Sequence, residues 1–272
     1  MNGPVELHEK DIRDDGRRSS KGNQLKWQKD GFWYKADYCG YEGLAEYLVS
    51  ELLKHSTLSA DMFVGYETVE IRYRQSLFRG CVSKDFLRPG DQLITLERLF
   101  MNAYHQSLTE SIFRIADHKE RLRFLTDRVS ALTGIKEFGT YICILMTIDA
   151  LILNEDRHMH NIALILDRNG QYHLSPVFDH GAALLSDLSL DYPLAMNVYD
   201  AIDSVQAKTF STDFEEQLTL SEELYGDPIH FSYTERDLKN ILAQEHYYPE
   251  EYKRRCFDVL MDRRRKYNYL FQ

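Results

Sequence analysis

The sequence LILNEDRHMHNIALI, residues 151–165, decides how the fold of this chain is interpreted. In it an apolar run ends, a short polar segment follows, and a second apolar run begins. This order predicts a buried helix that leads into a loop and a buried strand that leads away from it. The loop contains Asp156 and Asn161, and Asp179 follows within SPVFDHG, residues 175–181. Three oxygen-bearing side chains beside buried elements predict a phosphoryl-transfer site.

The chemistry of phosphoryl transfer explains why these residue types belong together. Transfer of a γ-phosphoryl group depends on positioning and on neutralising charge. It needs a carboxylate near the acceptor hydroxyl, which Asp156 can supply, and oxygen ligands for Mg²⁺, which Asn161 and Asp179 can supply. Asp156 and Asn161 have the Asp-x-x-x-x-Asn spacing of a kinase catalytic loop, and Asp179-His180-Gly181 takes the place of the Asp-Phe-Gly element.

The site also needs a cation for the α- and β-phosphates, and Lys35 can supply it. An Asp-Gly turn at residues 30–31, between aromatic and apolar segments, predicts a β-hairpin whose second strand carries this lysine. Apolar residues at helical spacing predict an amphipathic helix over residues 42–54, and its Glu46 can hold Lys35. Taken alone, the two would be a strand-edge lysine and a solvated glutamate, so their assignment depends on the loop motifs.

The remaining elements change from strands to helices along the chain. Residues 1–18 are charged, mixed in sign and without a period of 2 or 3.6, so we expect a mobile arm there. The helix predicted over residues 137–153 is apolar nearly all round and belongs in the middle of a lobe. Residues 181–228 are less regular in pattern. The other expected elements are strands at 63–73 and 76–83, a helical region from 105 to a stop at Gly134, a second hairpin around 167–170, and helices within 234–270.

The bulk properties exclude several classes of protein. A formal net charge of −10 argues against bulk nucleic-acid binding. The four cysteines form no CxxC pair, so a reducing, cytoplasmic location is expected. We find no signal peptide, and the longest apolar run is shorter than the roughly 20 residues of a membrane span, so no membrane span is expected.

Together these motifs resemble the HipA-like serine/threonine kinases. The resemblance rests on NEDRHMHN at 154–161 followed by SPVFDHG at 175–181. Its Asp-Arg-His-x-x-Asn core is shared with phosphatidylinositol 3/4-kinases. An N-terminal segment, SSKGNQLK at 19–26, looks like the phosphate loop Ser-x-x-Gly-x-Gln-x-Lys of that family. Because the chain begins almost at this loop, it resembles the short, stand-alone members.

The resemblance implies an α+β fold with the two lobes of a protein kinase. The expected organisation is a flexible arm at 1–18, a small β-rich N-lobe with one helix at 19–100, and a larger, mostly helical C-lobe at 101–272. It also implies a role for each motif residue. Those roles are Asp156 as base, His158 with Arg157 as organisers of the catalytic loop, Asn161 and Asp179 as metal ligands, and Gly22, Gln24, Lys26, Lys35 and Glu46 as residues that bind ATP.

The function implied is an ATP- and Mg-dependent transfer to serine or threonine of a protein substrate. The family resemblance extends this to a toxin of a toxin–antitoxin system, with an antitoxin or inhibitory partner. It also makes Ser19, with Ser20 beside it, a candidate for autophosphorylation. A phosphate there would add negative charge where the ATP phosphates bind.

Other classes remain open from the sequence. Within kinases, the acceptor can instead be a small molecule or a lipid, and residues 96–99 are our prediction for the segment that contacts adenine. A pseudokinase would bind nucleotide without transfer. A metallohydrolase could use a cluster drawn from Asp156, His158, His160, His173, Asp179 and His180, although the chain has no HExxH motif. That class leaves the lysines and the phosphate loop unexplained.

Overall fold

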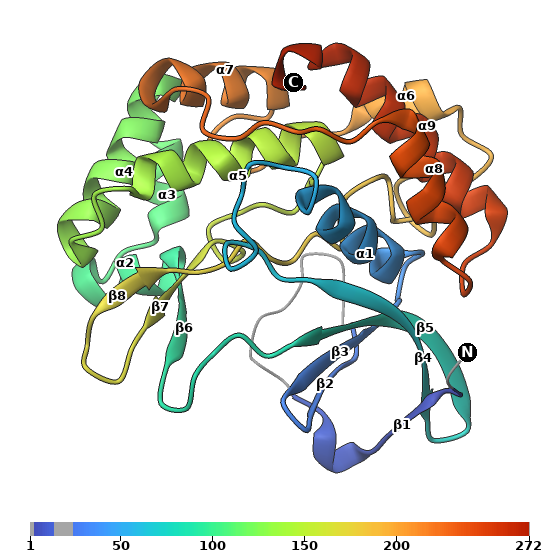
Figure 1. Cartoon of the computed structure of the whole chain (residues 1–272). Helices are drawn as coiled ribbons and strands as arrows, with labels where there is room; N and C mark the ends of the chain where they lie inside the picture. The colour runs from blue at the N-terminus through green and yellow to red at the C-terminus, as the bar shows by residue number, and fades with distance from the viewer. Residues whose placement is uncertain (1–2, 14–23, 272) are drawn as a thin grey trace. The chain divides into compact units, whose positions relative to one another are not determined.

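The computed structural model describes residues 3–13 and 24–271. Helices and strands both occur along the chain, which is therefore an α+β protein, as predicted (Figure 1). It divides into two compact units. The first unit comprises Met1–Asp85, Phe178–Val205 and His230–Gln272, and the second comprises Phe86–Val177 and Gln206–Ile229. The chain passes between the units several times, so neither is one continuous range.

A five-stranded sheet, ordered β1-β4-β5-β3-β2, forms the framework of the first unit. Only the pair β1 and β4 is parallel, and the other neighbours are antiparallel. Figure 1 shows the strands in the lower right of the view. Their bounds are β1 Val5–Leu7, β2 Lys26–Lys29, β3 Phe32–Ala36, β4 Tyr66–Tyr73 and β5 Ser76–Lys84.

The hairpin predicted at residues 30–31 is confirmed. Strands β2 and β3 pair with Lys26 opposite Lys35, and the two-residue turn between them has φ of 51° at Asp30 and 79° at Gly31. Positive φ at both central residues is the geometry that fits the twist of a short hairpin, and Asp-Gly tolerates it. The turn therefore sets the register that places Lys35 in the sheet.

Strand β1 departs from the arm expected over residues 1–18. Val5–Leu7 pair in parallel with β4, and Ile12 bridges to Trp27 of β2. Leu7 is buried in the apolar cluster of the sheet. A strand of three residues is too short to show the alternation of period 2 that identifies strands in a sequence. Residues 14–18 lie outside the described residues.

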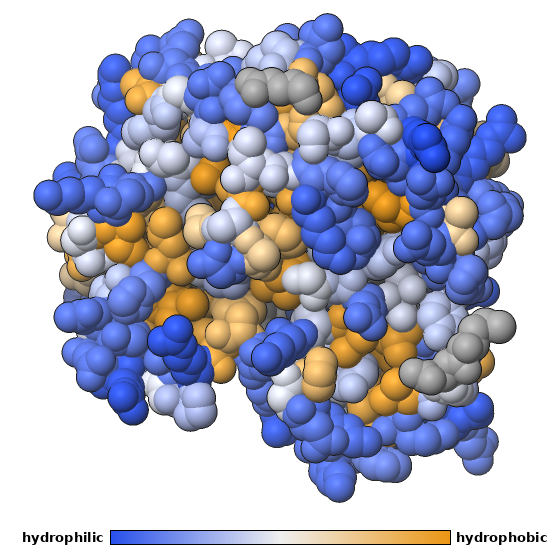
Figure 2. Space-filling model, in the orientation of Figure 1, coloured by the Kyte–Doolittle hydropathy of each residue, from blue (hydrophilic) through white to orange (hydrophobic). Residues whose placement is uncertain are grey.

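Alternation along the strands gives the sheet two unlike faces. One carries the apolar cluster, which contains Leu7, Trp27, Ala36, Val69, Ile71 and Tyr73. In the space-filling view, apolar residues remain visible over this sheet among hydrophilic neighbours (Figure 2). Because side chains of a strand alternate between faces, Lys35 lies on the side opposite to Ala36. That side is packed against helix α1, Glu42–Leu53.

Helix α1 confirms the amphipathic helix predicted at 42–54. Leu44, Leu48 and Leu52 are fully buried, and so is Glu46. The first unit also contains further helical elements. They are η1 Glu9–Asp11, α6 Val198–Ser204, α8 Glu235–Gln244, α9 Glu250–Lys266 and η2 Asn268–Leu270.

The second unit is built around helix α5, Phe138–Ile152, in which every residue except Thr140 is buried. This confirms the prediction of a helix apolar nearly all round. Helices α4 and α7 pack on it, and a Cβ on Gly139 would overlap the ring of Tyr225, so α7 approaches closely only because glycine stands there. The other helices of this unit are α2 Leu96–Tyr104, α3 Leu108–Phe113, α4 His118–Thr133 and α7 Phe214–Tyr225.

A three-stranded antiparallel sheet of order β6-β7-β8 completes the second unit. Its strands are β6 Gln92–Thr95, β7 Ala163–Leu166 and β8 Tyr172–Leu174. The hairpin of β7 and β8 confirms the turn predicted at 167–170. Residues 96–99, proposed to contact adenine, form the first turn of α2. Among the described residues, no helix is both long and apolar enough to cross a membrane.

Candidate active site

A buried lysine shared by two carboxylates is the central feature of the first unit. Lys35 Nζ lies 2.5 Å from Glu46 Oε1 and 2.6 Å from Asp179 Oδ1. Strand β3 supplies the lysine, helix α1 supplies Glu46, and the segment after Val177 supplies Asp179. The structure thus brings together three residues that the sequence analysis selected from positions far apart in the chain.

Charge pairing keeps Lys35 protonated although it is buried. Burial alone would lower the pKa of Lys35, but Asp179 and Glu46 together raise it well above its ordinary value. For Glu46, burial raises the pKa and the ammonium of Lys35 offsets part of that rise. One cation between two carboxylates leaves a net negative cluster, which suits the binding of a further cation or of a metal-bound phosphate.

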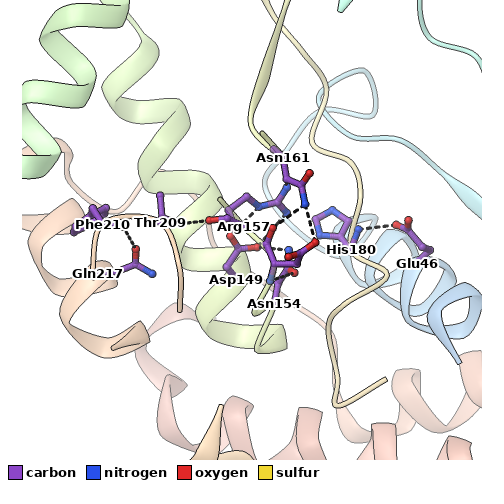
Figure 3. A network of polar contacts seen from close by, with 10 residues as sticks. Glu46, Asp149, Asn154, Arg157, Asn161, His180, Thr209, Phe210 and Gln217 are labelled. Atoms are coloured by element: carbon purple, nitrogen blue, oxygen red, sulfur yellow. Dashed lines mark hydrogen bonds and ion pairs between the residues drawn. The ribbon is translucent and has the colours of Figure 1, made fainter. Parts of the chain in front are cut away.

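Two further contacts hold Asp179 and the residue after it. The second carboxylate oxygen of Glu46 accepts a hydrogen bond of 2.8 Å from the backbone N–H of His180 (Figure 3). The Tyr66 hydroxyl accepts a long one, 3.5 Å, from the N–H of Asp179, and the Tyr66 ring lies 5.4 Å from Lys35 Nζ. Tyr66 was not predicted from the sequence. The alternation of side chains along β4 could have identified it, because that alternation places Tyr66 on the sheet face opposite to the apolar cluster.

The backbone at Asp179 is in the left-handed region, with φ of 63°. An aspartate adopts this conformation more readily than most residues, yet it still costs free energy. The contacts of Asp179 with Lys35 and Tyr66 stabilise it locally. The conformation directs the carboxylate toward the lysine.

In the second unit, a closed ion pair supports the loop that carries Asp156. Arg157 binds Asp149 with two hydrogen bonds, Nε to Oδ2 at 2.9 Å and Nη2 to Oδ1 at 3.1 Å. The Asn154 side chain donates to the same carboxylate at 3.0 Å, and Thr209 Oγ1 donates to the backbone oxygen of Arg157 at 2.6 Å. Figure 3 shows Arg157 at the centre of these contacts. Burial raises the pKa of Asp149 despite the opposing effect of Arg157.

Arg157 was predicted from the sequence as an organiser of this loop, but Asp149 was not. The available signal was a single carboxylate within the apolar run of α5, eight residues before the arginine. A buried carboxylate requires a partner, so this position carried information.

Asp156 and Asn161 are in direct contact. Asn161 Nδ2 donates to Asp156 Oδ2 at 2.9 Å and to the backbone oxygen of Asp156 at 2.8 Å. His158 Nε2 lies 3.5 Å from Asp156 Oδ1, and the N–H of His160 donates to His158 Nδ1 at 3.2 Å. The amide nitrogen of Asn161 is thereby engaged by the loop, which leaves its oxygen as the atom suited to a metal ion. The carboxylate of Asp156 is fixed on both sides.

The other predicted residues have simpler surroundings. Lys26 begins β2 opposite Lys35, and Gln24 is half-buried just before it. Ser19, Ser20 and Gly22 lie outside the described residues.

The histidine cluster of the metallohydrolase alternative does not form among the described residues, where no group of three His, Cys, Asp or Glu side chains could hold a metal. His173 instead pairs with Asp167 at the second hairpin, at 3.2 Å. The donors suited to Mg²⁺ are the hard oxygens of Asn161 and Asp179, which fit that ion in type.

The chain is similar to known proteins in structure, whereas comparison of its sequence with known families and curated proteins finds no match. The structure is similar to that of the proinflammatory kinase CtkA of Helicobacter pylori, with a TM-score of 0.62 and 16% identity over 98% of this chain and 96% of that one. It is also similar to HipA of Shewanella oneidensis, solved with HipB and operator DNA, with a TM-score of 0.51 and 12% identity over 95% of this chain and 63% of that one. The chain therefore has the bilobal α+β fold of the HipA-like kinases, as the motifs predicted.

Proposed function

We propose that this protein is a kinase that transfers the γ-phosphoryl group of ATP with Mg²⁺. The observation that carries the proposal is Lys35 held between Glu46 and Asp179, at 2.5 and 2.6 Å. This arrangement combines a fixed cation, its helix carboxylate and a carboxylate suited to a metal ion. The fold shared with HipA-like kinases supports the same conclusion.

In the first unit, Lys35 would bind the α- and β-phosphates of ATP. Phosphate oxygens then replace Asp179 as its second partner, while Glu46 keeps the side chain in position. Asp179, released from the lysine, would contribute an oxygen to Mg²⁺. The phosphate loop would add Gly22, Gln24 and Lys26 around the phosphates, a role that rests on their motif.

In the second unit, Asp156 would accept the proton of the acceptor hydroxyl. Asn161 orients its carboxylate through Oδ2, and His158 lies on the side of Oδ1. The Asn161 oxygen would be the second protein ligand of Mg²⁺. When bound, that ion neutralises charge on the phosphates. The function requires both clusters to serve one nucleotide.

For the acceptor, we propose a serine or threonine of a protein. This assignment and a role as a toxin with an antitoxin or inhibitory partner come from the motifs. They are supported by likeness to a HipA whose structure contains HipB. Autophosphorylation at Ser19 or Ser20 belongs to the same proposal, as does the division into lobes at 19–100 and 101–272. A cytoplasmic location is part of it too, because all four cysteines are free and buried.

The test is phosphoryl transfer from labelled ATP to proteins of a cell lysate, with acceptors identified by mass spectrometry. The wild type is compared with Asp156→Asn and with Asp127→Asn, a matched control at an exposed position on α4. We expect acceptor labelling, and labelling of the chain itself, with the wild type and the control but not with Asp156→Asn. Equal and negligible labelling by all three would contradict the proposal.

A further inference from the structure

Asp37 joins strand β3 to the first turn of helix α1. It lies two residues after Lys35, and its Oδ1 accepts a hydrogen bond of 2.7 Å from the backbone N–H of Gly43. The N–H groups at the start of a helix have no partner within the helix. Tyr41, the N-cap residue of α1, makes no side-chain capping bond. Asp37 therefore supplies, from the segment that follows β3, the cap that the helix itself lacks.

A second carboxylate binds from the helix back to the connecting segment. Glu42, the first residue of α1, accepts hydrogen bonds from the backbone N–H groups of Cys39 at 2.6 Å, Gly40 at 3.1 Å and Tyr38 at 3.3 Å. The connecting segment and the first helical turn thus hold each other through two carboxylates, Asp37 and Glu42.

The packing around this junction leaves no room for adjustment. A Cβ on Gly43 would lie 2.5 Å from a backbone carbon of Gly80 and 2.6 Å from the Tyr248 hydroxyl. A Cβ on Gly80 would overlap the backbone oxygen of Lys35. The start of α1 is therefore pressed through Gly80 of β5 onto the backbone of β3. A shift of Gly43 would be transmitted to Glu46, which is three residues further along the same helix.

The Asp37–Gly43 hydrogen bond and the Lys35–Glu46 ion pair are thus two links between the same strand and helix, about one turn apart. If the Asp37–Gly43 hydrogen bond weakens, the start of α1 can move, and Glu46 is then held less firmly against Lys35. Glu46 must stay at the lysine when Asp179 leaves it for a metal ion. The Asp37–Gly43 hydrogen bond therefore matters most when Asp179 has left Lys35.

The surroundings of Asp37 make its charge sensitive to pH. Burial and the neighbouring Glu42 raise the pKa of Asp37 to about 7, and the Gly43 N–H, the Tyr248 hydroxyl and Arg79 oppose the rise.

The groups that face Asp37 come from each element packed against it. They are Glu42 of α1, Arg79 and Cys81 of β5, and Tyr248 from the segment between α8 and α9. A surface cavity of about 350 Å³ brings solvent close to the carboxyl and so gives protons a route to it. Its lining residues are Asp37, Gly40, Glu70, Leu77, Phe78 and Arg79.

We propose that Asp37 is a positioning residue for the kinase site: its carboxylate fixes the first turn of α1 to the end of β3, which holds Glu46 against Lys35, and its protonation weakens that link. An ionised carboxylate accepts a stronger hydrogen bond than a protonated one and is favoured at a helix N-terminus. Activity is therefore higher above the midpoint of this ionisation and lower below it. The part about activity rests on the proposed kinase function, whereas the link itself does not.

The test combines a structural and a kinetic readout on the full chain between about pH 5 and about pH 9. NMR of the ¹⁵N-labelled protein follows the amide of Gly43, and transfer of phosphate from ATP gives kcat/KM. The variants are Asp37→Asn, which keeps the shape and removes the ionisation, and Tyr248→Phe, which removes one group that lowers the pKa of Asp37. Glu70→Gln is the matched control, because Glu70 lines the same cavity and makes no bond to Gly43.

We expect the Gly43 amide to titrate near pH 7 in the wild type and in Glu70→Gln, at higher pH in Tyr248→Phe, and not in Asp37→Asn. We expect kcat/KM of Asp37→Asn to be about tenfold below the wild type at high pH and equal to it at low pH. A Gly43 amide that does not titrate in the wild type would overturn the link. Identical pH profiles of kcat/KM for the wild type and Asp37→Asn would overturn the positioning role. A wild type without transfer activity refutes the kinase function, and the Gly43 titration then still decides the link.

Discussion

Two buried ion clusters of this chain have the same chemistry and different construction. Arg157 and Asp149 are both 2% exposed and form a bidentate pair that Asn154 completes. Lys35 is also buried, but it divides its contacts between Glu46 and Asp179, whose side chain is 28% exposed. The first cluster is closed, because both of its charged side chains are almost fully buried. The second is open on one side, so one carboxylate can be exchanged for a ligand.

This difference distinguishes a cluster that supports a loop from a cluster that can bind a ligand. A closed, bidentate pair fixes the backbone of the loop that presents Asp156 and Asn161. A lysine with one buried and one partly exposed partner can release the exposed one to bind phosphate. Sequence motifs name residues of both kinds, and the burial of each partner distinguishes their roles.

Asp149→Ala should have the largest effect, because it leaves Arg157 buried without its carboxylate. We expect the free energy of unfolding to fall by about 3–5 kcal/mol. Denaturant titration followed by circular dichroism measures this loss. Asp127→Ala, at an exposed position, should stay within about 0.5 kcal/mol of the wild type. A loss for Asp149→Ala as small as that of the control would show that the pair is not the closed support described above.

Lys35→Met should act on catalysis more than on stability. We expect kcat/KM for ATP to fall about 10²-fold, because the phosphates lose their cation. The free energy of unfolding should fall less than in Asp149→Ala, since the pKa of Glu46 is already raised and this carboxyl can take up a proton. Lys84→Met, at the exposed end of β5, is the control for activity and stability. Unchanged kcat/KM in Lys35→Met would contradict the role of an open cluster.

Tyr66→Phe should give a smaller effect on the same cluster. The ring beside Lys35 is kept, and the hydroxyl that accepts from Asp179 is lost. We expect kcat/KM to fall about fivefold and the free energy of unfolding to fall by about 1 kcal/mol. Tyr34→Phe, on the opposite face of the sheet, should change neither value by comparable amounts. Equal effects of the two substitutions would mean that the Tyr66 hydroxyl does not position Asp179.

Asp37 should leave a signature in the pH dependence of stability. Its pKa is about 7 in the folded chain and 3.8 in the reference state, so the folded protein holds this proton over a range where the unfolded chain has lost it. The stabilisation from this group is complete below the lower value and is lost as pH rises through the upper one. The free energy of unfolding of Asp37→Asn relative to the wild type should therefore increase over that range. A constant difference would contradict the raised pKa.

The sequence predicts best the parts of the fold whose signals are local. The Asp30-Gly31 hairpin, the amphipathic helix at 42–54 and the apolar helix α5 are all present. Each follows from turn chemistry or a period that a short window contains. Strand β1 and helices α6 and α7 escaped prediction. The strand has three residues, and α6 and α7 lie in the part of the chain whose sequence pattern is less regular.

The candidate site divides in the same way. Lys35, Glu46, Asp156, Asn161 and Asp179 belong to motifs with fixed spacing or to recognisable elements. Asp149, Tyr66 and Asp37 do not, because each matters through a partner far away in sequence or through packing that only the folded chain creates. Asp37, for example, caps α1 from the start of the connecting segment that follows β3, whereas capping rules examine the residue directly before the helix.

We propose that the open cluster and the Asp156 loop contribute to the same phosphoryl transfer. The most direct measurement is the rate at which the purified full chain releases ADP from Mg-ATP in the presence of lysate protein, for the wild type, Asp156→Asn and Asp127→Asn. We predict that Asp156→Asn is at least about 10²-fold slower than the other two, since it lacks the base that accepts the hydroxyl proton. The same rate for all three proteins would contradict the account.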